Sequence, residues 1–97
     1  METDMQRITD EMARNMLRQM AEYDDHVASC ACNLHAAEGN DSFDVELWRA
    51  AHEAAKTYAS IWREGMRALG VEPVEDAGRV SGAMVRRDGG ADFVALD

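Results

Sequence analysis

The stretch 38-EGNDS-42 divides the chain into two helical segments and therefore decides its fold. Its glycine and turn-forming residues end any helix that arrives from the N-terminal side. Asp41 or Ser42 then serves as the N-cap of a second helix, and acids follow in its first turn, where the helix dipole favours them. Because the connection is short, we expect two antiparallel neighbouring helices.

Residues 3–37 are predicted to form the first helix. No Gly or Pro interrupts this segment, and Thr3 or Asp4 can cap its start. At about 100° per residue, one apolar stripe runs along its length. The stripe consists of Met5, Ile8, Met12, Met16, Met20, Tyr23, Val27, Cys30 and Leu34.

Residues 43–69 are predicted to form the second helix, which ends at Gly70 and is followed by Pro73. Alanines spaced four apart let another helix approach closely, and Trp48 and Trp62 lie at either end of that line. Its apolar stripe consists of Leu47, Trp48, Ala51, Ala55, Tyr58, Ala59, Trp62, Met66 and Leu69.

The last third of the chain has a different composition, with several glycines and alternating apolar residues. Asp88-Gly89 suits a tight turn between strands near 79–86 and 91–96, and the alternative is a poorly ordered tail. The expected fold is thus all-α, with a helical hairpin domain at residues 1–70 and a C-terminal segment at 71–97 that forms at most a β-hairpin.

Both helical stripes are broader than one neighbouring helix covers, which predicts self-association into a helical bundle. The first predicted helix is also longer than the second. Met5 and Ile8 therefore extend past the end of the second helix and must be buried by the C-terminal segment or by a second chain. Methionine-rich surfaces either fill gaps in a core or bind partners adaptably. The predicted self-association residues are Met5, Ile8, Met12, Met16, Met20, Trp48 and Trp62.

The formal charge of −9 excludes some classes of partner. Contacts to a DNA or RNA backbone need a basic face, and an anionic membrane repels this chain. The acids either solvate helix surfaces or form a patch for a basic partner, including as a mimic of nucleic acid. No transmembrane helix or signal peptide is predicted, and the thiols are expected to be free, so a cytoplasmic protein is the expectation.

The segment 26-HVASCACNLH-35 contains two cysteines and two histidines. On a helix, Cys30 and Cys32 point in nearly opposite directions, so they do not share an ion or a relaxed disulfide. A weaker candidate metal site combines His26, Cys30 and His52. Hydrogen-bonded or solvated polar residues at the edge of a stripe are far more common than a set of metal ligands, so we expect no metal and no cofactor.

Catalysis is not expected from this sequence. Glu22-x-x-Asp25 has the spacing of the magnesium-binding acids in helical nucleotide pyrophosphatases, but both side chains point away from the stripe. The common phosphate-binding, metalloprotease and hydrolase motifs do not occur.

Arg79, Arg86 and Arg87 form the one local group of basic residues. They are either solvated or part of an anion pocket at a subunit interface. The predicted function is therefore non-catalytic binding, in which a self-assembling acidic protein engages or inhibits another macromolecule. The alternative is an oligomer that sequesters a phosphate-containing small molecule such as a cyclic nucleotide, by analogy of shape with small viral helical-hairpin proteins.

Overall fold

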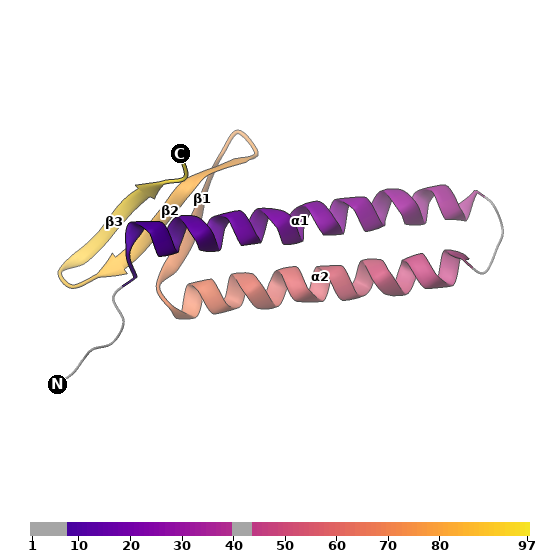
Figure 1. The fold of residues 1–97 in the computed structure, drawn as a ribbon, viewed down its shortest axis with the longest axis horizontal. Helices are drawn as coiled ribbons and strands as arrows, with labels where there is room; N and C mark the ends of the chain where they lie inside the picture. Colours follow the sequence, from indigo (N-terminus) through magenta and orange to yellow (C-terminus); the bar gives the residue numbers. More distant parts are fainter. Residues whose placement is uncertain (1–7, 40–43) are drawn as a thin grey trace. The chain divides into compact units, whose positions relative to one another are not determined.

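The computed structural model describes residues 8–39 and 44–97, which form two helices followed by a three-stranded sheet (Figure 1). The elements are α1 (Asp10–Glu38), α2 (Asp44–Ala68), β1 (Val71–Asp76), β2 (Arg79–Arg87) and β3 (Gly90–Ala95). The antiparallel helical hairpin is confirmed. The prediction of an all-α class is wrong, because three paired strands at the C-terminus make the chain an α+β protein.

Helix α1 begins later than the predicted residue 3. The Thr9 hydroxyl oxygen accepts a hydrogen bond from the Met12 backbone N–H at 3.1 Å, so Thr9 is the N-cap. The predicted caps Thr3, Asp4, Asp41 and Ser42 lie outside the described residues. Helix α2 stops at Ala68 and Gly70 adopts a φ of 85°, which confirms the predicted glycine stop.

The sheet has the order β1-β2-β3, and both of its pairs are antiparallel. Strands β2 and β3 confirm the predicted β-hairpin, with Asp88-Gly89 in the turn between them. Strand β1 was not predicted, because Pro73 and its acidic neighbours are rare in strands. Since the Gly70 carbonyl accepts from the Arg86 N–H, alternation along the strand places the Pro73 nitrogen on the outer edge, where no ladder bond is lost.

A β-bulge interrupts the pairing of β1 with β2. Val74 pairs with Gly82 and Glu75 with Val80, so that Ser81 is the extra residue. The Ser81 hydroxyl donates to the Val74 carbonyl at 3.3 Å. A Cβ atom at Gly82 would lie 2.7 Å from the Phe93 ring and 3.0 Å from the Ala95 Cα, so only glycine fits beside β3 at this point.

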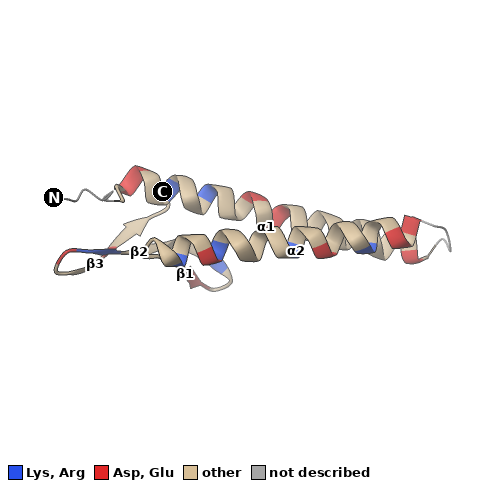
Figure 2. Cartoon of the chain, turned by 90° about the horizontal axis from the view of Figure 1, so that it is seen from below, with Lys and Arg blue, Asp and Glu red and all other residues tan. Residues whose placement is uncertain are grey.

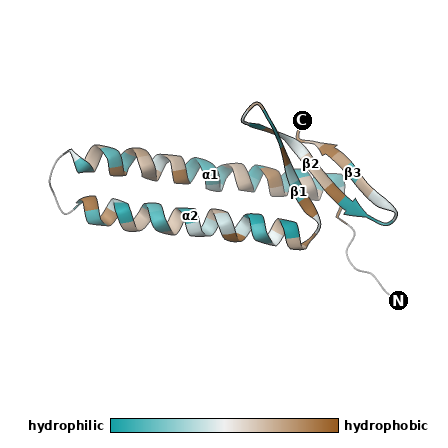
Figure 3. Cartoon of the chain, turned by 180° about the vertical axis from the view of Figure 1, so that it is seen from behind, coloured by the Kyte–Doolittle hydropathy of each residue, from teal (hydrophilic) through white to brown (hydrophobic). Residues whose placement is uncertain are grey.

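The structure divides into two compact units. The sheet unit comprises residues 8–19 and Glu64–Asp97, and the hairpin unit comprises the described part of Met20–Arg63. Apolar residues occur within the strands and along both helices (Figure 3). The predicted division into residues 1–70 and 71–97 stays a prediction. The core of the sheet unit contains Ile8, Ala13, Leu17, Met66, Val71, Ala83, Val85 and Val94, and that of the hairpin unit contains Met20, Cys30, Ala37, Ala55 and Ala59.

Candidate binding surfaces

The hairpin unit carries three large apolar side chains that its own fold leaves exposed. Leu47, Tyr58 and Ile61 are 58%, 60% and 60% exposed. At about 100° per residue, Tyr58 and Ile61 lie within about 40° of Leu47 on the surface of α2. Ala50 and Ala54 are also exposed and lie on the same side of the helix. We call these five residues the α2 stripe.

The α2 stripe is exposed because the apolar arc of α2 is wider than its contact with α1. Ala55 and Ala59 are buried, and they lie about 80° and 120° around the helix from Leu47. Beside them, the Trp62 and Tyr23 rings pack with centroids 5.7 Å apart, and Arg63 pairs with Asp24 at 2.7 Å. The whole arc covers about 180°, whereas one packed helix face is about 100° wide. The other half has no partner among the described residues.

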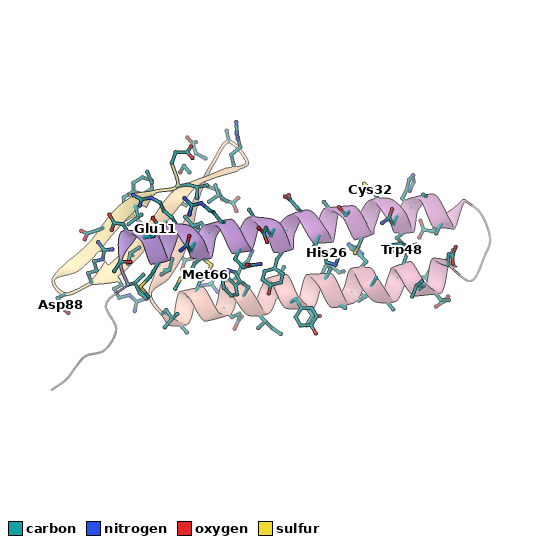
Figure 4. The ribbon with its side chains drawn as sticks, viewed as in Figure 1. Glu11, His26, Cys32, Trp48, Met66 and Asp88 are labelled. Carbon is teal, nitrogen blue, oxygen red and sulfur yellow. The ribbon has the colours of Figure 1, made fainter. Side chains whose placement is uncertain are left out.

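The predicted self-association residues differ in how far they are exposed. Ile8 and Met20 are only 8% and 1% exposed, so each is core within its own chain. Met16, Trp48 and Trp62 are half-buried, Met12 is partly exposed, and Met5 lies outside the described residues. Trp48 points from α2 toward α1 (Figure 4). Sequence reasoning placed Leu47 and Tyr58 in the broad apolar stripe of the second helix and did not select Ile61.

Acidic residues follow one edge of the α2 stripe. Glu46 and Glu53 lie about 100° and 120° from Leu47, on the side opposite to the contact with α1. Their side chains are 81% and 65% exposed, and they pair with Arg49 and Lys56 one turn further along. Acidic and basic residues are both distributed along this helix in Figure 2.

The Arg87 guanidinium forms its hydrogen bonds within the sheet unit. Its guanidinium donates to the Asp10 carboxylate at 2.8 Å, to the Asp92 carboxylate at 2.9 Å and to the Ile8 carbonyl at 2.9 Å. The hydrogen bond to Asp10, followed by that to Asp92, raises the pKa of Arg87 above its ordinary value. Arg87 therefore links the start of α1 to the sheet by hydrogen bonds. Arg14 of α1 forms a second link, because it donates to the Ala95 carbonyl at 3.0 Å.

The three predicted anion-binding arginines do not converge. Arg79 and Arg86 are exposed at opposite ends of β2, and seven residues of strand span about 24 Å. Arg86 and Arg87 are consecutive on the strand, so their side chains point to opposite faces of the sheet. No pair of these arginines thus shares one anion within this chain.

The candidate metal ligands meet only in part. The Cys30 sulfur lies 3.7 Å from His26 Nε2, and Cys30 is buried. His52 is half-buried on α2, and within residues 8–39 and 44–97 no three His, Cys, Asp or Glu side chains gather as a metal site. Cys32 is exposed on the side of α1 away from α2, which confirms that the two cysteines point apart (Figure 4).

Two further features bear on chemistry. Glu22 and Asp25 are both exposed on α1, as the spacing argument expected. A shallow hollow on the hairpin unit contains two cations, Lys56 and Arg63, which are paired with Glu53 and Asp24. No acid pair and no unpaired cation lines this hollow, whose described lining is Asp24, Val27, Ala28, Lys56, Ala59, Ser60 and Arg63.

The sheet unit also exposes large apolar side chains, with Leu69 at 57%, Phe93 at 52% and Met12 at 38%. Phe93 is exposed on β3, and its partner across the strands is the half-buried Met84. One edge of the Phe93 ring lies against Gly82, next to the bulge. We regard the α2 stripe as the stronger candidate for binding, because its large exposed residues lie along one side of a single helix, whereas Met12, Leu69 and Phe93 belong to three different segments of the chain.

The chain matches no protein-family model, no curated protein and no solved structure. Neither helix, over the residues that the structure describes, is long and apolar enough to cross a membrane.

Proposed function

We propose that this protein binds another macromolecule without catalysis, and that the α2 stripe is its binding surface. The observation that carries this proposal is the exposure of about 60% at Leu47, Tyr58 and Ile61 on one line of a helix. Scattered single apolar residues are ordinary on a surface, but an aligned set is typical of an interaction site.

The shape of the stripe favours a protein as the partner. Ile61 lies fourteen positions after Leu47, which corresponds to about 21 Å along the helix axis. A line of this length offers no enclosed pocket for a small molecule, whereas it matches the face of a second helix.

Self-assembly is the second candidate use of the same surface. The methionine-based interface predicted from the sequence has less support, because Ile8 and Met20 pack inside their own chain. The anion-sequestering alternative also has less support, since Arg87 already contacts two carboxylates and a carbonyl.

A pull-down with the full chain tests the proposal. The wild-type protein is compared with Ile61→Asp, which puts a charge into the stripe, and with Ser60→Asp, whose side chain points about 100° away. Wild type and Ser60→Asp are expected to retain the same partner, and Ile61→Asp to lose it. Equal recovery by all three proteins would overturn the proposal.

Light scattering on the same three samples separates the two uses of the surface. A wild-type mass above the monomer that falls with Ile61→Asp indicates self-assembly through the stripe. A monomer in all samples, with partner retention as above, indicates a different macromolecule.

A further inference from the structure

We infer that the α2 stripe takes an amphipathic helix whose apolar residues are flanked by Lys or Arg. This inference rests on the proposed function and names the chemistry of the partner. It follows from the side-chain sizes along the stripe and from the charges at its edge.

The side chains of the stripe form a surface with large ends and a small middle. Leu47 lies at one end, Tyr58 and Ile61 at the other, and the exposed Ala50 and Ala54 lie between them. Small residues let a second helix approach closely, and the large residues at either end then pack against its sides. The apolar face of a partner helix, with anchors three and four residues apart, fits this relief.

The acidic edge adds a preference for charge. Glu46 and Glu53 extend beside the stripe and are largely exposed. Their pairs with Arg49 and Lys56 are exposed ion pairs, which hold carboxylates only weakly. A partner with Lys or Arg beside its apolar residues brings those cations to the two carboxylates as the apolar faces meet.

A second copy of the chain fits this edge less well. In an antiparallel pairing of α2 with its symmetry mate, the two acidic edges lie on the same side and repel each other. The net charge of −9 opposes any self-association further. A basic helix meets the same surface with attraction, which is why we commit to it as the occupant.

The test uses two synthetic helical peptides with the same leucine stripe. One carries Lys on both flanks of the leucines, and the other carries Glu at those positions. Calorimetric titration of the full chain is expected to show binding of the Lys peptide that weakens as salt rises, and no binding of the Glu peptide. Ile61→Asp is expected to lower the affinity for the Lys peptide about tenfold or more, and Ser60→Asp to leave it at least as tight.

Reversal of the acidic edge supplies the second arm. The double variant Glu46→Lys with Glu53→Lys is expected to weaken binding of the Lys peptide and to allow binding of the Glu peptide. Circular dichroism before titration establishes that the variants keep their helices. A merely structural role of the two acids would weaken binding of the Lys peptide without creating any binding of the Glu peptide.

Three results would overturn the inference. The first is equal binding of both peptides, and the second is binding of the Lys peptide that is unchanged in Ile61→Asp. The third is a wild-type dimer that depends on Ile61 and that neither peptide dissociates, which makes a second copy the occupant. In the third case the stripe still binds a protein, so the proposed function survives while the inference fails.

Discussion

At the scale of single residues, Gly82 is the position where the sheet has the least room. A Cβ atom there would meet the Phe93 ring at 2.7 Å and the β3 backbone at Ala95. We expect Gly82→Ala to lower the free energy of unfolding by about 1–3 kcal/mol, because the two strands must separate. Urea unfolding followed by circular dichroism measures this loss.

Gly65 is the matched control for that experiment. It lies inside α2, and a Cβ atom there meets nothing within 4 Å. Gly65→Ala is expected to raise stability by about 0.5–1 kcal/mol, because alanine loses less backbone entropy in a helix. Destabilisation of similar size in both variants would show that the close approach at Gly82 is not the cause.

Arg87 gives the second prediction at this scale. Arg87→Lys keeps the charge, but a single ammonium cannot reproduce the fork that reaches Asp10, Asp92 and the Ile8 carbonyl. We expect a lower melting temperature for Arg87→Lys. Arg86→Lys, at the exposed neighbouring residue, is the control and is expected to leave the melting temperature almost unchanged. Unchanged stability of Arg87→Lys would contradict the structural role and restore the anion-binding hypothesis.

The pH dependence of this contact follows from its sign. Pairing with Asp10 raises the pKa of Arg87, so the stabilisation from the charged guanidinium is complete below the ordinary pKa of arginine. It is lost only as strong alkali deprotonates the folded state. Titration of Arg87 is therefore expected to cause no change, across neutral pH, in the difference in melting temperature between wild type and Arg87→Lys.

At the scale of the elements, Thr9 decides where α1 begins. Removal of its hydroxyl in Thr9→Ala leaves the Met12 N–H without its acceptor, and we expect a loss of about 1 kcal/mol in the free energy of unfolding. Thr9→Ser is expected to restore most of the loss. The control is Thr57→Ala, since the Thr57 hydroxyl only bonds the Glu53 carbonyl within α2, and its change is expected to stay within about 0.5 kcal/mol.

The elements also show where sequence reasoning works. Apolar periodicity, the turn at 38–42 and Gly70 predicted both helices, and Asp88-Gly89 predicted the pairing of β2 with β3. Periodicity could not locate the start of α1, because residues 3–9 continue the same apolar stripe. It also could not find β1. A strand that contains Pro73 forms here only as an edge strand, whose hydrogen bonds to β2 come from the residues on either side of the proline.

At the scale of the whole molecule, the sequence predicted an unpartnered apolar surface but not its position. Ile8 and Met20 were predicted to take part in self-association, with the C-terminal segment as the alternative cover for Ile8, and both side chains are buried within the chain. An apolar stripe in the sequence indicates that one face of a helix is buried against something. The packing of the other elements determines which residues of that face are buried within the chain. The exposure of Ile61 beside the buried Ala59 could be found only from the structure.

The central claim is that the α2 stripe is a surface of the folded chain and not part of its core. Equilibrium unfolding of Ile61→Asp beside Ala59→Asp tests it most directly, because the two residues are only two positions apart in α2 but point to nearly opposite sides of the helix and are 60% and 8% exposed. At a concentration where light scattering gives a monomer, Ile61→Asp is expected to stay within about 0.5 kcal/mol of wild type. Ala59→Asp buries an unpaired charge and is expected to unfold or to lose about 3 kcal/mol or more. Equal, severe destabilisation by both substitutions would contradict the account, because it would place Ile61 inside the protein.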